Sequence, residues 1–387
     1  MLLALCQALG MSISSMLLSA AGLVGESLAP DPKWATLPLS AQFLFTMFAT
    51  LPASLLMQRK GRRFGFILAC LVMMLSATGS AMAIYSGHFV GFVASAMGMG
   101  IALGFFQYFR FAAIDVAPAK YASKAISWVL AGGLLAAFIG PNLAAMTRSL
   151  DVGHPFLFTM LCAIPLSLLM IFLFWRMDLP LPNAEEILGK KRPLATILRQ
   201  PTFIVAVVSA MIAYGVMTLL MTATPLAMKG HGFGFGQTAF IIQWHLVGMF
   251  APSFFSGTLM SRIGILPVML MGVLAYLAVV LINMQPQSMA SYWSALVLLG
   301  VGWNFLFIGA TSLLHDAWWP AEKGRVQGIN DTLVFSMSSL AAMGSGLLYA
   351  SIGWKATNLV SLPFSVLAGG MIIYLMLQRR RSALAVD

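Results

Sequence analysis

The chain has 387 residues, of which 60% are hydrophobic and 9% are charged, and its mean hydropathy is +0.91. Soluble globular proteins carry about 25% charged residues, so this composition excludes that class and indicates a membrane protein. The net charge of +11 comes without a basic groove of interleaved aromatic residues, which argues against a nucleic-acid partner.

Twelve apolar segments are each long enough to cross the ~30 Å hydrocarbon core of a bilayer as a helix. We interpret the first as a retained helix, because it lacks the basic start of a signal peptide. In chain order the predicted helices cover 3–26, 36–57, 64–86, 88–116, 124–147, 155–177, 202–227, 236–260, 265–284, 289–316, 325–351 and 355–377.

A hydrophilic stretch after the sixth helix divides the chain into halves. We predict an N-terminal six-helix bundle over 1–179, a cytoplasmic linker over 180–200 and a C-terminal six-helix bundle over 201–387. This helix order places both termini on one side of the membrane. That side carries all of the 22 Lys and Arg residues except Lys33, Arg148, Lys229 and Lys355. Basic residues favour the cytoplasm, so both termini are predicted to be cytoplasmic.

The two halves share a short motif at a helix junction. It reads Ser54-Leu-Leu-Met-Gln-Arg-Lys-Gly61-Arg-Arg in the first half and Gly257-Thr-Leu-Met-Ser-Arg-Ile-Gly264-Ile-Leu in the second. Repeated halves of six helices are typical of transporters that move one half against the other. The predicted fold class is an all-α integral membrane protein with twelve transmembrane helices in two pseudo-symmetric bundles.

The first copy of this motif resembles the cytoplasmic signature of the major facilitator superfamily, Gly-x-Leu-x-Asp-Arg-x-Gly-Arg-Arg. The resemblance covers the whole chain and implies the major facilitator fold in a bacterial inner membrane. One departure from the signature matters, because Gln58 replaces its acidic residue. In the family that carboxylate helps to lock the outward-facing state. A lock of that kind is therefore expected to be weaker here or to rely on Asp115 and Asp331.

Charged and glycine residues near the predicted cytoplasmic helix ends are interpreted as a gate. Arg110 and Asp115 lie five residues apart and therefore do not share a helix face. We expect each of them to pair with a residue of another helix. An incidental set of interfacial charges is the alternative. The predicted gate residues are Arg59, Gly61, Arg62, Arg63, Gln107, Arg110, Asp115, Arg262, Gly264, Arg325 and Asp331.

His245 is the only histidine deep within a predicted span, and ionisable groups in a membrane usually mark function. An unperturbed histidine titrates at about pH 6.5, so it can exchange protons. It shares a helix face with Gly248 and Pro252. Gln42 occupies the corresponding position in the first half. A proton or substrate ligand and a neutral histidine bonded between helices both remain open.

Uncharged polar residues within the predicted helices are the other candidates for substrate contact. The resemblance to the major facilitator superfamily implies that helices 1, 4, 7 and 10 line the central cavity. Few fixed charges and many aromatic residues favour a neutral, flat or amphipathic molecule. The predicted substrate or proton contacts are Gln7, Gln42, Asn142, Tyr214, Gln243, His245, Trp303 and Asn304.

The predicted function is secondary active transport by alternating access. No Gly-x-x-x-x-Gly-Lys motif is present, so we expect a proton gradient to supply the energy. We predict no enzymatic activity, cofactor or metal site. The expected partners are a small-molecule substrate, protons and the lipid bilayer, with the protein acting as a monomer.

Three alternatives remain open, two for the direction of transport and one for the class of protein. Both export of drugs or metabolites and uptake of a nutrient fit the sequence. The stretch from Gln243 to Phe254 resembles a subgroup of bacterial transporters that includes riboflavin carriers, and the direction of transport stays open. A membrane scaffold or receptor that does not transport is the alternative from another class.

Overall fold

The computed structural model describes residues 1–31, 34, 37–181 and 189–384, and within these ranges the chain is helical and contains no strand. Residues 182–188 of the predicted linker lie outside the described residues. The helices are α1 (Leu2–Leu28), α2 (Leu37–Lys60), α3 (Arg62–Tyr85), α4 (Phe89–Phe106), α5 (Phe109–Val116), α6 (Ala122–Ala131), α7 (Gly133–Thr147), α8 (Leu157–Leu161), α9 (Ala163–Arg176), α11 (Leu194–Leu198), α12 (Pro201–Gly230), α13 (Phe235–Phe250), α14 (Ser253–Ile263), α15 (Ile265–Asn283), α16 (Met289–Leu314) and α17 (Lys323–Leu384).

Several of the predicted spans are interrupted helices. The span predicted over 236–260 breaks into α13 and α14 at Pro252, which has no N–H for the helix ladder. The span predicted over 124–147 breaks into α6 and α7 at the Gly132-Gly133 pair, a common site of kinks. Shorter breaks separate α4 from α5 at Gln107-Tyr108 and α8 from α9 at Cys162.

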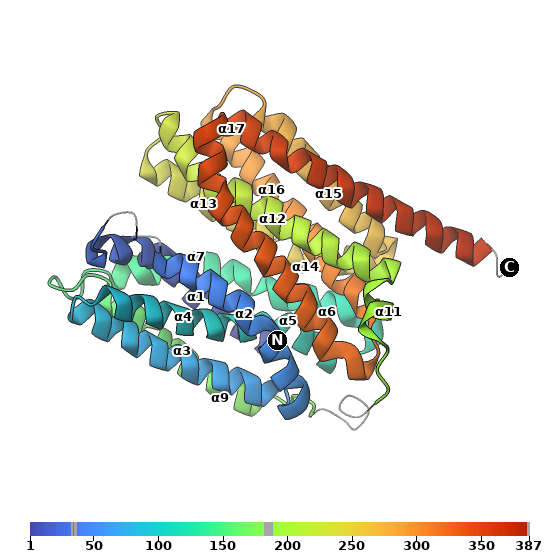
Figure 1. Ribbon diagram of the computed structural model, residues 1–387, viewed down its shortest axis with the longest axis horizontal. Helices are drawn as coiled ribbons and strands as arrows, with labels where there is room; N and C mark the ends of the chain where they lie inside the picture. The colour runs from blue at the N-terminus through green and yellow to red at the C-terminus, as the bar shows by residue number, and fades with distance from the viewer. Residues whose placement is uncertain (32–33, 35–36, 182–188, 385–387) are drawn as a thin grey trace. The chain divides into compact units, whose positions relative to one another are not determined.

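The last two predicted spans are joined as α17 by a single non-helical residue. Gly353 adopts φ 73° and ψ 178°, a backbone conformation that favours glycine. Figure 1 shows the two parts of α17 meeting there in a sharp turn. Ten of the described helices are long and apolar enough to span a bilayer, and α1 and the part of α17 before Gly353 complete the twelve.

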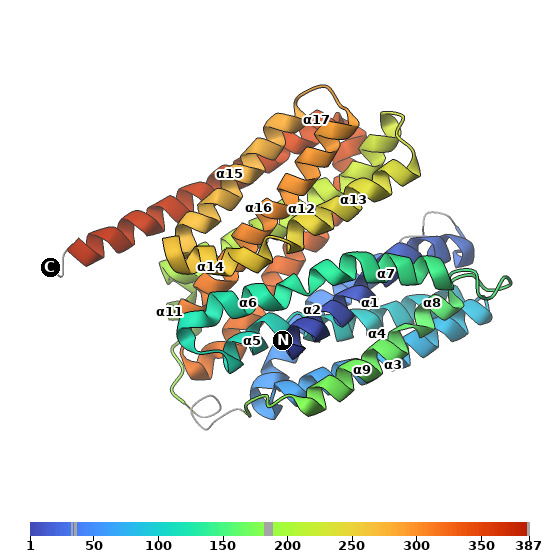
Figure 2. The ribbon, with the colours of Figure 1, turned by 180° about the vertical axis from the view of Figure 1, so that it is seen from behind.

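The helices form two compact units. Unit 1 contains Met1–Ala117, Gly132–Lys190 and Pro320–Thr332, and unit 2 contains Pro118–Ala131, Lys191–Trp319 and Leu333–Asp387. In unit 1, α3 lies beside α4 and α9, and in unit 2, α16 lies beside α13 and α15 (Figure 1 and Figure 2). Each unit thus includes a short segment from the other sequence half, while the boundaries at 179 and 201 remain a prediction from the repeat.

Glycines allow close helix contacts in both units. In unit 1, a Cβ at Gly100 of α4 would collide with the backbone of Gln42 in α2. In unit 2, a Cβ at Gly300 of α16 would lie 2.5 Å from the carbonyl oxygen of His245 in α13. The two polar residues that correspond in the sequence repeat therefore both lie at glycine-mediated helix crossings, where backbones can approach closely.

The predicted topology can be tested with reporter fusions. Reporters placed within residues 180–200 and after Arg381 should both report a cytoplasmic location, because the basic residues gather at these ends. Alkaline phosphatase and green fluorescent protein fusions measured in parallel provide this check. A periplasmic signal at either position would contradict the assigned orientation.

Candidate functional site

A buried ionic cluster in unit 1 connects α3 and α5 to the start of α17. The cluster consists of Arg62, Arg110, Asp115, Lys323 and Asp331. The Arg62 Nε lies 3.0 Å from Oδ2 of Asp115, and the Lys323 Nζ lies 2.7 Å from Oδ1 of the same carboxylate. Because Asp115 is bonded through both oxygens, its negative charge is compensated by two cations.

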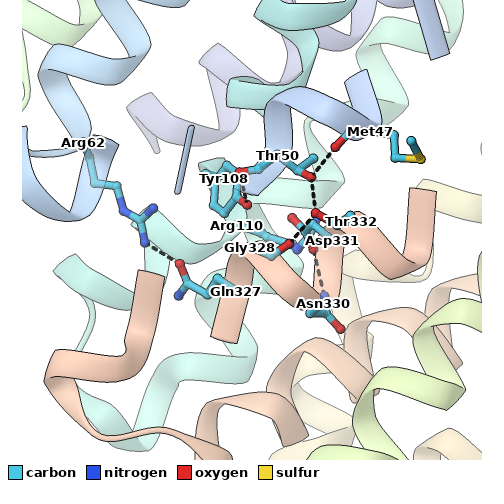
Figure 3. Close-up of polar contacts among 10 residues, drawn as sticks. All are labelled: Met47, Thr50, Arg62, Tyr108, Arg110, Gln327, Gly328, Asn330, Asp331 and Thr332. Carbon is cyan, nitrogen blue, oxygen red and sulfur yellow. Dashed lines mark hydrogen bonds and ion pairs between the residues drawn. The ribbon is translucent and has the colours of Figure 1, made fainter. Parts of the chain in front are cut away.

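The second ion pair of the cluster is more deeply buried. Arg110 Nη2 pairs with Oδ1 of Asp331, and their side chains are 2% and 0% exposed. Asn330 Nδ2 donates to the same oxygen at 2.8 Å, and Figure 3 shows these groups converging. Arg110 and Asp115 were expected to pair with other helices, and both do.

Further hydrogen bonds extend this contact along α17. The Arg62 Nη2 donates to Oε1 of Gln327 at 2.8 Å, and the hydroxyls of Thr50 and Thr332 lie 3.0 Å apart (Figure 3). The Tyr108 hydroxyl donates to the carbonyl oxygen of Thr50 at 2.8 Å. A segment of ten residues at the start of α17 is thus bonded to α2, α3 and α5 within unit 1.

Gln58, the residue that departs from the family signature, participates in the same contact. Its Nε2 donates to the carbonyl oxygen of Ala321 at 2.9 Å. A Cβ at Gly324 would collide with the Gln58 side chain, so glycine permits this approach. The amide supplies one neutral bond where the signature has a carboxylate, and the charged contacts are made by Asp115 and Asp331 instead.

The repeated motif glycines have matching conformations. Gly61 joins α2 to α3 with φ 89° and ψ 156°, and Gly264 joins α14 to α15 with φ 94° and ψ 161°. These values lie outside the regions that other residues favour, so the motif needs glycine at both junctions. The sequence repeat therefore corresponds to a repeated turn in each unit.

Other predicted gate residues lie outside the ionic cluster. Arg59, Arg262 and Arg325 are exposed. Arg63 donates to the carbonyl oxygen of Met177. Gln107 is half-buried at the break between α4 and α5.

Some members of this contact were not among the predicted site residues: Thr50, Tyr108, Lys323, Gln327, Asn330 and Thr332. A signal for four of them was present in the sequence, since Lys323, Gln327, Asn330 and Thr332 all lie within eight residues of Asp331. Asn330 bonds the neighbouring Asp331, but the partners of Lys323, Gln327 and Thr332 lie in distant helices of the first sequence half, so the spacing alone does not reveal those bonds.

His245 is fully buried in unit 2, between α13 and α16. Its Nδ1 lies 2.8 Å from the carbonyl oxygen of Leu296 and must carry a hydrogen, because a carbonyl only accepts. Its Nε2 is buried without a hydrogen-bond partner among the described residues. In this arrangement a proton on Nε2 would place an uncompensated charge in an apolar interface, which is costly.

Asn304 also lies in a helix interface. Its Nδ2 lies 2.6 Å from both the carbonyl oxygen of Met249 and the Oγ of Ser253. These two acceptors flank the break between α13 and α14 at Pro252, so the amide links α16 to both segments. The side chain is fully buried, and its predicted contact with substrate remains untested.

Aromatic side chains from several helices of unit 2 form a cluster around Tyr214. The cluster is defined as Tyr214, Phe250, Trp303, Phe307 and Phe335. The Tyr214 ring centroid lies 5.4 Å from Trp303, 4.8 Å from Phe307 and 5.4 Å from Phe335. Trp303 is 1% exposed, whereas Tyr214 is half-buried and is the more accessible of these two predicted contacts.

A hydroxyl pair lies next to the aromatic cluster. Thr218, one turn after Tyr214 in α12, has its Oγ1 2.9 Å from the Oγ of Ser338 in α17. Both side chains are almost fully buried. The other predicted substrate residues are dispersed: Gln7 and Gln42 are buried in unit 1, Asn142 is exposed on α7, and Gln243 is half-buried on α13.

Comparison with known proteins gives one consistent family. The family model described as Major Facilitator Superfamily matches residues 1–342. The riboflavin transporter RfnT of Brucella anthropi is 38% identical over 370 residues, which cover 95% of this chain and 92% of that protein. An uncharacterized MFS-type transporter of Bacillus subtilis, YdeG, is 28% identical over 91% of this chain and 86% of its own length.

A solved structure shows the same fold at low sequence identity. The Escherichia coli fucose:proton symporter FucP has a TM-score of 0.80 to this chain at 14% identity, over 96% of this chain and 97% of its own. Together with the family model and the relative in Brucella, this likeness confirms the predicted all-helical fold. The chain therefore belongs to the major facilitator superfamily and is a multi-pass membrane transporter.

Proposed function

We propose that this chain takes up riboflavin across the bacterial inner membrane by alternating access. The observation that carries the proposal is the 38% identity to a riboflavin transporter over 95% of the chain. A match of this extent includes both sequence halves. It also favours nutrient uptake over drug export.

The aromatic cluster supports a flavin substrate. Riboflavin is uncharged and combines a planar three-ring system with a chain of hydroxyl groups. Planar rings interact favourably with aromatic side chains in stacked or edge-to-face geometry. Tyr214 offers a half-buried aromatic surface backed by Trp303 and Phe307, and the cluster contains no charged side chain. The hydroxyls of Thr218 and Ser338 are nearby polar groups for the hydroxyls or ring edge of the substrate.

The ionic cluster is proposed as the cytoplasmic gate. Its residues from α17 belong to the second half of the sequence repeat, whereas Arg62, Arg110 and Asp115 belong to the first. A transporter that moves its halves against each other must break such contacts to open on that side. The ion pairs are almost inaccessible to water. Opening would hydrate the charged groups, and their hydration would offset part of the lost Coulomb energy.

We propose the proton gradient as the energy source and His245 as the residue that couples it to transport. The Nδ1–H is held by the carbonyl of Leu296, which leaves Nε2 as the nitrogen that can accept a proton. Because a charge there would be uncompensated in the closed helix interface, protonation would require the interface to open to water. Such a link between protonation and conformation is what coupling requires.

Uptake of radiolabelled riboflavin by a riboflavin-auxotrophic strain without a carrier of its own tests the proposed substrate. The wild-type chain should support uptake and growth. Tyr214→Ala should lower the uptake rate about tenfold, equivalent to ~1.4 kcal/mol, because a stacked ring is lost. Tyr214→Phe should retain most activity.

The matched control is Trp175→Ala, which removes an aromatic ring that is 73% exposed on α9 in unit 1. This control should leave uptake unchanged. Membrane levels of each variant should be compared by immunoblot. Absence of riboflavin uptake by correctly inserted wild-type protein would overturn the proposed substrate.

A further inference from the structure

An apolar groove lies between α12 and the final part of α17 in unit 2. Its volume is about 430 Å³, within the ~300–1,000 Å³ range of small-ligand sites. We name it the lipid groove, and its lining residues are Pro201, Ile204, Val205, Leu367, Gly370, Met371 and Tyr374. Leu367 is 51% exposed and Tyr374 is 61% exposed, so the groove opens outward from the helix pair.

The floor of the lipid groove is widened by a glycine. A Cβ at Gly370 would meet no heavy atom within 4 Å, so the space above it is open. In a chain that spans a membrane, an open apolar surface of this kind faces hydrocarbon tails. An acyl chain therefore matches the lining in chemistry.

Arginines gather at one end of the groove. Arg379 lies five residues beyond Tyr374, or about 7.5 Å along the helix. Its Nη2 lies 3.4 Å from the hydroxyl of Thr202 and 3.3 Å from the carboxylate of Asp316. Arg380 and Arg381 follow it and are exposed.

Two further arginines lie near the same end of unit 2. Arg192 donates to the carbonyl oxygen of Ala317, the residue after Asp316, at 2.9 Å. Arg199 is exposed three residues before Thr202. Five arginines thus belong to the segments that adjoin this end of the groove, where Arg379 pairs with the carboxylate of Asp316, so positive charge is in excess there.

We propose that this groove binds an anionic phospholipid, with an acyl chain along α12 and α17 and the headgroup phosphate at Arg379 and Arg380. Apolar lining continuous with a basic end matches the two parts of such a lipid, and basic pockets between transmembrane helices bind anionic headgroups. The proposal does not depend on the identity of the transported substrate.

Native mass spectrometry of the full-length protein with equimolar phosphatidylglycerol and phosphatidylcholine tests the site. The wild type should retain phosphatidylglycerol preferentially. The double variant Arg379→Gln/Arg380→Gln should lose that preference, with about a fivefold fall in phosphatidylglycerol binding per arginine. Gly370→Leu should reduce binding of both lipids, because its side chain fills the groove without meeting protein atoms.

Matched controls separate this site from general effects. Arg176→Gln removes an exposed arginine at the end of α9 in unit 1, and Gly344→Leu adds the same side chain in open space on α17 outside the groove. Both should leave lipid retention unchanged, and thermal unfolding in detergent should report the folding of every variant. If Gly370→Leu folds poorly, Ile204→Phe fills the groove from α12 instead.

Four results would overturn the proposal. The wild type could bind both lipids equally, the double arginine variant could keep its preference, or both groove-filling variants could bind lipid normally. A dimer in wild type that is lost with Gly370→Leu, without a change in lipid binding, would assign the groove to a second copy and also reject the lipid site.

Discussion

Replacing Asp331 by asparagine is expected to abolish transport and to reduce the stability of the folded protein strongly. The substitution keeps the size of the side chain but leaves the buried guanidinium of Arg110 without its countercharge. Removing one partner of a buried ion pair costs about 3–5 kcal/mol, which is a large part of a typical folding free energy of ~5–15 kcal/mol. Thermal unfolding in detergent and riboflavin uptake measure the two effects.

A double variant distinguishes the roles of this pair in folding and in transport. Arg110→Met/Asp331→Leu removes both charges and should recover much of the lost stability, because apolar pairs often replace buried ion pairs well. Transport should stay impaired if the pair must separate into water during the cycle. The control is Asp178→Asn, the same substitution at an exposed residue of unit 1. It should change the free energy of unfolding by no more than about 0.5 kcal/mol. Full transport by Asp331→Asn would show that the pair is not part of a gate.

Substituting glutamine for His245 is expected to abolish accumulation of substrate against a gradient while exchange of substrate across the membrane continues. The glutamine amide can still donate to the carbonyl oxygen of Leu296, so the contact between α13 and α16 is retained. It cannot titrate, so the proposed coupling to protons is lost. Proteoliposome assays with and without an imposed pH gradient measure accumulation and exchange separately.

His231→Gln is the matched control for this substitution. His231 lies just after α12, where its Nδ1 contacts the carbonyl oxygen of Ala227 and the hydroxyl of Tyr292. Its replacement should leave the pH dependence of accumulation unchanged. Accumulation by His245→Gln with the same pH dependence as wild type would assign His245 a structural role and place coupling elsewhere.

Much of the fold could be predicted because a bilayer imposes a length and a charge asymmetry on every span. The twelve helices follow from that constraint, and the glycine junctions at Gly61 and Gly264 follow from the repeated motif. The helix breaks at Gln107 and Gly132 were not predicted, because the spans that contain them are apolar throughout their length. At such positions the local hydrogen-bond ladder changes while the apolar composition does not.

The candidate site was predicted less completely, and the reason is physical. Charged residues are rare in the predicted spans, so Arg110, Asp115 and Asp331 could be recognised as candidates. Their bonding to other helices is confirmed. In apolar spans, however, lipid-facing and protein-facing surfaces have the same composition. Periodicity therefore did not show that Asn304 joins helices at a break, or that Phe335 contacts Tyr214.

Counterflow of riboflavin with purified protein in proteoliposomes is the most direct test of the proposed activity. Vesicles loaded with unlabelled riboflavin should take up radiolabelled riboflavin transiently above the external concentration, and protein-free vesicles should not. Excess external unlabelled riboflavin should suppress the signal, whereas an equal concentration of fucose should not. Correctly folded, reconstituted protein that shows no riboflavin counterflow would contradict the assignment of this transporter to riboflavin.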